Sequence, residues 1–139
     1  MKILLKHKKF EGSIIFTYDD KGRCIAFAFN CEITSELWDF IFEYFPAHYE
    51  SIKNKCFANF QKIDVPEDTS FEAFWKVYNY KIGNKERAKK LWELLDEQTR
   101  VLVFNSIKKY ATFLANKPSM EKAYPETWLK QRRWENSFE

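Results

Sequence analysis

The spacing of apolar residues changes once along this chain, at the turn-forming stretch Pro66-Glu67-Asp68. Before it, short runs of β-branched and aromatic residues alternate with polar ones, as they do in strands. After it, aromatic and aliphatic residues recur three and four positions apart, as on the packed face of a helix. The sequence therefore predicts an α+β protein, with a β-rich α+β module over residues 1–68 and a helical basic-aromatic module over residues 69–139. We expect the two modules to form one compact unit.

A small antiparallel β-meander with a covering helix is expected in the first module. In its third strand, Ile25 and Phe27 alternate with small residues, which predicts a half-buried strand. A meander of this size needs a helix on its apolar face. Thr34 or Ser35 can cap such a helix, and Pro46 can end it. The meander strands are expected at residues 2–8, 13–18 and 24–30, a short helix at residues 47–56 and a fourth strand at residues 57–65.

The second module contains start signals for four helices. Thr69 and Glu72 form a capping box, which predicts that the first helix is capped by Thr69. Asn84 and Asp96 can cap the next two helices, and Pro125 can take the first position of a last, short helix. The side chains expected to face the core are Phe71, Phe74, Trp75, Tyr78, Ala88, Leu91, Trp92, Leu95, Val101, Phe104, Ile107, Ala111, Leu114, Trp128 and Leu129.

The sequence carries no catalytic or metal-binding motif. His7 and His48 are the only histidines, and neither has a cysteine or histidine at metal-ligand spacing. Cys24 and Cys31 are seven positions apart and so do not form a C-x-x-C pair. With three glycines in the whole chain, there is no glycine-rich loop to hold a phosphate. We therefore expect a protein that is not an enzyme, with no catalytic residue, no metal site and no cofactor.

The chain has no apolar run of about 18 residues, the length that a transmembrane helix needs. Its first residues return to charge at Lys6 after three apolar positions, so they lack the apolar core of a signal peptide. The three cysteines are an odd number and lie among apolar residues, which is typical of reduced, buried thiols. We expect a cytoplasmic protein that does not engage a membrane.

Positive charge is concentrated in the second half of the chain. Residues 1–69 hold 9 Lys and Arg against 11 Asp and Glu, whereas residues 70–139 hold 14 against 9. This asymmetry favours one surface that meets an anionic partner, since Lys and Arg release counterions from phosphates and exposed rings stack on bases. An ordinary solvated helix face is an alternative of equal weight. The candidate nucleic-acid or partner-binding residues are Lys81, Lys85, Arg87, Lys90, Lys108, Lys109, Lys130, Arg132, Arg133 and Trp134.

The densest group of candidate binding residues lies between Tyr124 and Trp134. Arg132 and Arg133 are its strongest candidates, because Arg pairs in a bidentate manner with phosphate or carboxylate. Trp128 can close the helical module as a packing residue, and Trp134 can either pack in the same way or stack on a partner. The segment thus combines packing residues with binding residues.

Several motifs in the second module resemble a known family. The motifs are Phe71-Glu-Ala-Phe-Trp-Lys-Val-Tyr78, Lys81-Ile-Gly-Asn-Lys85, Ala88-Lys-Lys-Leu-Trp92, Tyr110 and Tyr124-Pro-Glu-Thr-Trp-Leu-Lys-Gln-Arg-Arg-Trp134. In this order they resemble the helical module at the C terminus of many phage and prophage replication-type proteins, over about residues 70–136. Lys130 departs from that pattern, in which Asn is commoner. The first half resembles short stand-alone proteins of Bacteroidetes prophages.

The resemblance implies a non-catalytic accessory protein of a phage or other mobile element, acting in the host bacterial cytoplasm. We expect it to bind RNA or a host ribonucleoprotein as a monomer or weak homodimer. The favoured version is an anti-CRISPR protein, an inhibitor in host defence that engages an RNA-guided Cas nuclease with its guide RNA. An alternative is an accessory DNA-binding factor of phage DNA replication with a helicase-loader-like module. A second alternative is a structural or oligomer-forming protein.

Overall fold

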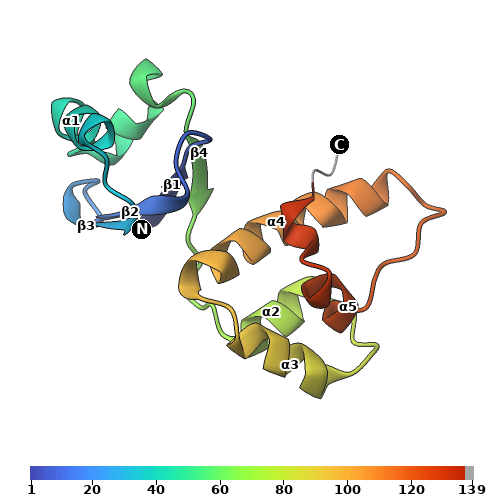
Figure 1. The fold of residues 1–139 in the computed structure, drawn as a ribbon. Helices are drawn as coiled ribbons and strands as arrows, with labels where there is room; N and C mark the ends of the chain where they lie inside the picture. Colours follow the sequence, from blue (N-terminus) through green and yellow to red (C-terminus); the bar gives the residue numbers. More distant parts are fainter. Residues whose placement is uncertain (137–139) are drawn as a thin grey trace. The chain divides into compact units, whose positions relative to one another are not determined.

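The computed structural model describes residues 1–136, and the chain divides into two compact units, Met1–Val65 and Pro66–Glu139. The first unit contains a sheet with α1, and the second is helical (Figure 1), which confirms the α+β class. Each unit has its own hydrophobic core. The boundary follows Val65, whereas the sequence placed it after residue 68. That the two modules form one compact unit stays a prediction.

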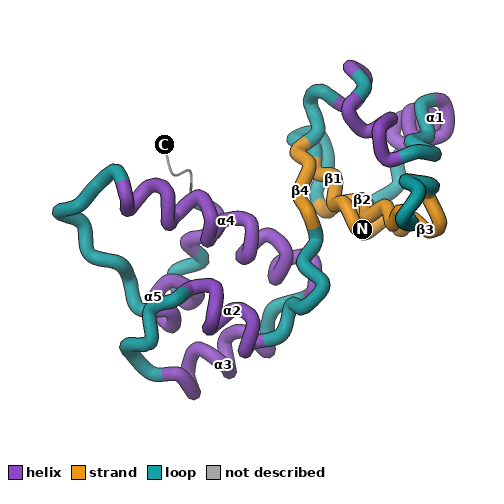
Figure 2. The backbone as a smooth tube through the Cα atoms, turned by 180° about the vertical axis from the view of Figure 1, so that it is seen from behind, coloured by secondary structure: helices purple, strands orange, loops and turns teal. Residues whose placement is uncertain are grey.

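A four-stranded antiparallel sheet forms the centre of the first unit. The strand order is β3-β2-β1-β4, so β3 and β4 are the edges (Figure 2). The meander and the returning fourth strand are therefore as expected from the sequence. The strands are β1 (Lys2–Lys6), β2 (Gly12–Tyr18), β3 (Cys24–Cys31) and β4 (Gln61–Asp64).

One face of this sheet is covered by α1 (Ser35–Glu43). Thr34 caps the helix, because its hydroxyl oxygen accepts a hydrogen bond from the Leu37 N–H at 3.1 Å. The helix buries Leu37 and Ile41, as its spacing predicted. The other buried residues of this core are Ile3, Leu5, Ile14, Phe16, Tyr18, Ile52 and Phe57.

Two sequence predictions for the first unit are wrong in detail. The helix expected at residues 47–56 is instead two 3-10 turns, Tyr49–Lys53 and Lys55–Phe57, separated by Asn54 in an extended conformation. Ile25 and Phe27 are exposed rather than half-buried, because β3 is an edge strand and no further strand lies beside it within residues 1–136.

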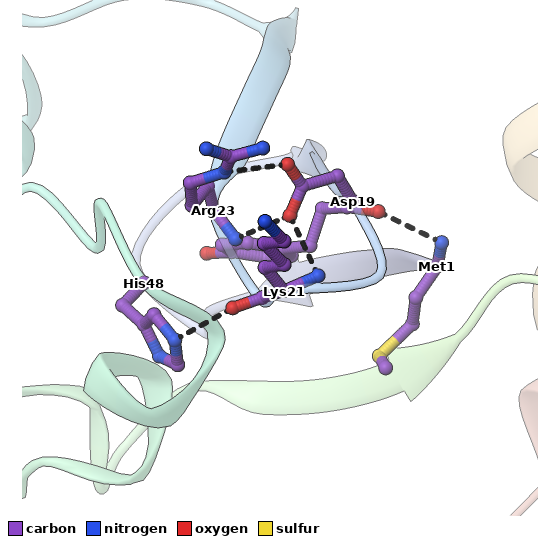
Figure 3. A network of polar contacts seen from close by, with 6 residues as sticks. Met1, Asp19, Lys21, Arg23 and His48 are labelled. Carbon is purple, nitrogen blue, oxygen red and sulfur yellow. Dashed lines mark hydrogen bonds and ion pairs between the residues drawn. The ribbon is translucent and has the colours of Figure 1, made fainter.

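The turn between β2 and β3 is closed by a polar network (Figure 3). An Asp19 oxygen accepts hydrogen bonds from the backbone N–H groups of Lys21 and Arg23 at 3.0 and 2.9 Å. His48 Nε2 lies 3.0 Å from the Lys21 carbonyl oxygen, and its Nδ1 accepts from the Glu50 N–H, so the neutral ring carries its proton on Nε2. These contacts join residues 19–23 to the segment that follows α1.

The helical unit contains α2 (Phe71–Tyr78), α3 (Lys85–Glu93), α4 (Glu97–Ala115) and α5 (Pro125–Lys130), followed by a 3-10 turn at Arg133–Glu135. Its core is aromatic: Phe74 stacks on Trp92 at 4.7 Å between ring centroids, and Tyr78 meets Trp128 edge-on at 5.9 Å. Such ring pairs add to the stability given by burial. Within residues 1–136, no helix is long and apolar enough to cross a membrane.

Three of the four predicted helix starts are confirmed: Asn84 and Asp96 cap α3 and α4, and Pro125 opens α5. The capping box at Thr69 is wrong. Ser70 caps α2 by accepting the Ala73 N–H at 3.2 Å. The Thr69 hydroxyl instead donates to the Glu97 carboxylate at 2.8 Å and so ties the start of α2 to the start of α4.

Near the end of the long helix α4, the residue that faces the core differs from the one that the sequence predicted. Ala111 is exposed, whereas Tyr110 is buried. The Tyr110 hydroxyl accepts a hydrogen bond from the Ala123 N–H at 3.0 Å, and the Tyr78 hydroxyl donates to the Ala123 carbonyl oxygen at 2.5 Å. The loop before α5 is therefore fixed to two helices by tyrosine side chains, which a helical spacing rule does not capture. Trp75, Leu91, Leu95 and Leu114, also expected in this core, are only partly buried.

Candidate functional site

A groove of about 670 Å³ runs between α3 and α5 in the helical unit. Two helix surfaces supply its walls, and both apolar and charged side chains line it. The lining residues are Arg87, Lys90, Leu91, Glu126, Thr127 and Lys130. We call this feature the basic groove, because three of its four charged residues are cations.

The α3 wall of the groove is placed by its helix cap. The Asn84 side chain accepts the Arg87 N–H at 3.0 Å, and its own backbone N–H donates to Glu126 of α5 at 2.9 Å. Gly83 precedes the cap with φ +103°, and a Cβ there would lie 3.0 Å from Glu126 and 3.2 Å from Tyr124. Glycine thus allows the chain to pass close to α5 in a conformation that other residues rarely adopt.

The α5 wall is held by the three residues that the short helix buries, Pro125, Trp128 and Leu129. With these side chains turned into the core, Glu126 and Thr127 are only partly buried and Lys130 is exposed on the groove side. Burial of Trp128 is therefore what places Lys130 near α3.

The three cations of the basic groove are available to a ligand. Within residues 1–136, Arg87, Lys90 and Lys130 form no ion pair, and all three are exposed. Glu126 already accepts a backbone hydrogen bond. Cations that converge on a concave surface raise the local concentration of anions, and the Leu91 side chain adds an apolar contact beside them.

Lysines outside the groove were also predicted to bind. Lys85 forms an ion pair with Glu72 at 3.7 Å, and its amino group lies 5.6 Å from the centre of the Trp75 ring. Lys108 and Lys109 are exposed on α4, and neither lines the groove. The structure therefore unites only Arg87, Lys90 and Lys130 of the ten predicted residues. Lys81 is exposed in the loop before α3 and does not line it either.

The C-terminal residues that the sequence favoured have local partners. Arg132 adopts φ +51° and donates to Glu135 at 2.9 and 2.6 Å, while its guanidinium lies 5.2 Å from the Trp134 ring centre. Arg133 donates to the Gln131 side chain at 2.7 Å. Trp134 is half-buried against the helical core. None of the three lines the basic groove.

Sequence reasoning did not select Lys122, which has a structural contact. Its amino group donates to the Tyr78 carbonyl oxygen and lies 4.6 Å from the centre of the Tyr78 ring. Burial lowers the pKa of Lys122 and raises the pKa of Tyr78. No motif in the sequence distinguishes this lysine from its exposed neighbours, because the contact spans 44 positions.

A second hollow lies at the β2–β3 turn and is lined in part by Asp19, Lys21, His48 and Glu50. Two of its carboxylates are already paired: Asp19 with Arg23 at 2.7 Å and Glu50 with Lys53 at 3.2 Å. In the described part of the chain, no cluster of three or more His, Cys, Asp or Glu residues is arranged to hold a metal ion. The basic groove is therefore the stronger candidate site.

Residues 66–132 match the model of one family, described as the Legionella vir region protein LvrA C-terminal domain. The match begins with the first residue of the helical unit and includes all the residues that line the basic groove. No curated protein and no solved structure matches the chain. The matched family is associated with mobile elements, which agrees with the expectation for this half of the chain. The closer assignments, to replication-type proteins and to Bacteroidetes prophages, stay predictions.

Proposed function

We propose that this protein is a non-catalytic accessory of a mobile element whose helical unit binds RNA through the basic groove. The observation that carries the proposal is the convergence of Arg87, Lys90 and Lys130, without carboxylate partners within residues 1–136, on a groove between two helices. The match of this unit to a domain of a vir region protein supports the mobile-element part of the proposal.

The chemistry of the groove suits a single strand. Phosphates bind Lys and Arg with release of counterions, and unpaired bases need exposed rings on which to stack. Tyr124 offers such a ring: it is exposed and lies two residues before Glu126 of the groove. Thr127 adds a hydroxyl that can bond a phosphate or a ribose. A strand could thus place phosphates between α3 and α5 and a base on Tyr124.

A pair of double variants tests this proposal. Lys90→Glu with Lys130→Glu reverses two charges in the groove, and Lys108→Glu with Lys109→Glu reverses two exposed charges on α4. Binding of a labelled single-stranded RNA is measured by fluorescence anisotropy across a range of salt. We expect the groove variant to bind at least about tenfold more weakly, and its log–log salt slope to fall by about 1.4, roughly 0.7 for each phosphate that the variant no longer neutralises.

The α4 variant is the matched control, and we expect it to bind RNA nearly as the unmodified protein does. Equally weakened binding in both variants would show that charge acts diffusely and that the groove is not the site. Absence of RNA binding by the unmodified protein at low salt would contradict the proposal outright. Tighter binding to duplex DNA than to RNA would favour the replication accessory instead.

The host target that we favour is a ribonucleoprotein, and the specific version is an anti-CRISPR protein acting on an RNA-guided Cas nuclease. A catalytically silent protein of a mobile element can act on such a complex by occupying its guide RNA. Pull-downs from a host that expresses a Cas complex, with and without RNase, test this version. Recovery of the complex that depends on intact RNA and on Lys90 and Lys130 is the expected result.

A further inference from the structure

The two edges of the sheet in the first unit differ in length and charge. β4 has four residues and carries Lys62 and Asp64, features with which natural sheets discourage pairing at an edge. β3 has eight residues and no charged side chain. Its start is covered, because the Cys24 N–H donates to the Ala47 carbonyl oxygen at 2.8 Å. From Ile25 to Cys31, no other strand within residues 1–136 pairs with its outer side.

An aromatic patch formed by residues of β3 and α1 lies beside this edge. Figures 1 and 2 show α1 passing over the β3 side of the sheet. Phe29 stacks on Trp38 at 6.1 Å between ring centroids, Trp38 contacts Phe42 at 4.4 Å, and Phe42 contacts Phe27 at 6.0 Å. Phe27, Trp38 and Phe42 are 41, 48 and 43% exposed, and Ile25 is 64% exposed. A contiguous apolar surface of this kind marks an interaction site.

The same part of the chain is acidic. Residues 24–52 contain five Asp and Glu and neither Lys nor Arg. Glu50 pairs with Lys53 at 3.2 Å, whereas the other four form no ion pair within residues 1–136 and are exposed. These four carboxylates are Glu32, Glu36, Asp39 and Glu43. We call the outer edge of β3, the aromatic patch and these carboxylates together the acidic-aromatic surface.

We propose that the acidic-aromatic surface binds an extended basic segment of a partner protein, which adds to β3 as a further strand. Backbone hydrogen bonds along residues 25–31 supply affinity, and apolar side chains on one face of the segment lie on the rings. Lys and Arg side chains meet the carboxylates, and one of them lies over the exposed Trp38 ring.

Charge decides which partner fits this surface. Four carboxylates without ion pairs in the described part of the chain repel the phosphates of nucleic acid, so the surface needs a different ligand from the basic groove. A second copy of this chain would bring a second set of the same carboxylates to the contact, and like charges facing one another across an interface are costly. A basic protein segment satisfies the open strand edge, the rings and the carboxylates at once.

The probe for this proposal is a labelled peptide of alternating Lys and Val, with an alternating Glu and Val peptide as the charge control. Both are titrated with the full chain by fluorescence anisotropy. We expect the basic peptide to bind and the acidic one not to bind. Trp38→Ser should weaken binding of the basic peptide at least about tenfold. Leu94→Ser, at a more exposed apolar residue of the helical unit, should leave binding unchanged.

Strand addition is tested separately by backbone amide exchange. Binding of the basic peptide should slow exchange of outward-facing amides within residues 25–31, because these groups gain hydrogen-bond partners. Absence of binding by the basic peptide, or binding that ignores Trp38→Ser or leaves these amides unprotected, would overturn the proposal. A dimer in ultracentrifugation that Ile25→Lys dissociates would also overturn it, since the second copy would then occupy β3.

Discussion

Trp128 connects the core of the helical unit with its candidate site. It is fully buried, its ring lies 5.9 Å from those of both Tyr78 and Tyr110, and it precedes Lys130 by two residues. Its indole N–H has no hydrogen-bond partner within residues 1–136. A buried donor left unpaired costs about 1–3 kcal/mol. Packing of the Trp128 ring therefore stabilises the unit, whereas its unpaired N–H destabilises it.

Two substitutions separate these contributions of Trp128. Trp128→Ala should lower the free energy of unfolding by about 3–5 kcal/mol through the cavity it leaves. Trp128→Phe should lower it by less than about 2 kcal/mol, because the smaller ring area is offset by removal of the unpaired N–H. Urea unfolding followed by circular dichroism measures both. A loss well above about 2 kcal/mol for Trp128→Phe would show that removal of the N–H brings no compensating gain.

At the scale of elements, Thr69 joins the start of α2 to the start of α4, and the neighbouring Ser70 caps α2. Ser70 satisfies a backbone N–H of its own helix, whereas Thr69 contacts Glu97 at the start of another helix. A cap bonds a backbone donor that would otherwise lack a partner, whereas the exposed Thr69–Glu97 pair competes with water. The two hydroxyls should therefore contribute unequally.

We expect Ser70→Ala to cost about 1 kcal/mol of stability, within the usual range for removal of a helix cap. Thr69→Val should cost less, about 0.5 kcal/mol, since it removes a solvent-exposed hydrogen bond between side chains. Thermal or urea unfolding of the two variants under the same conditions makes the comparison. A larger destabilisation by Thr69→Val would mean that it is the link between α2 and α4, rather than the cap, that stabilises the helical unit.

At the scale of the whole molecule, the two units carry surfaces of opposite chemistry. The basic groove holds Arg87, Lys90 and Lys130, and the acidic-aromatic surface lies in residues 24–52. Each surface belongs to a unit with its own core. A ribonucleoprotein offers both matching ligands, RNA for the groove and basic protein segments for β3, so the two proposals are compatible with one target.

The two surfaces should respond separately to substitution. The Lys90→Glu and Lys130→Glu variant should lose RNA binding and keep binding of the basic peptide. Trp38→Ser should do the reverse. Anisotropy titrations of both variants with both ligands give a complete comparison. If either variant weakened both ligands by similar factors, the ligands would share one site and the division of roles between the units would be wrong.

Local side-chain chemistry made much of the fold predictable. Asn84 and Asp96 cap their helices within three residues of themselves, and Pro125 begins α5 because a first-turn position does not need its missing N–H. The β-branched and aromatic residues of Ser13–Tyr18 likewise predicted β2. The choice between two adjacent capping residues was harder to predict. Thr69 and Ser70 can both cap a helix, and Thr69 is instead bonded to Glu97, which lies 28 positions away in the sequence.

What the sequence determined by itself was therefore most of the elements, the fold class and the charge of each half, because these depend on neighbours a few positions apart. The tertiary structure decided which cations share a site. Arg87 and Lys130 meet at one groove because Trp128 holds α5 in the core and Glu126 accepts the Asn84 N–H from 42 positions away. Arg132 is held by Glu135, three positions away, through a left-handed turn that charge density did not reveal. Contacts between distant residues follow from packing, which local spacing does not specify.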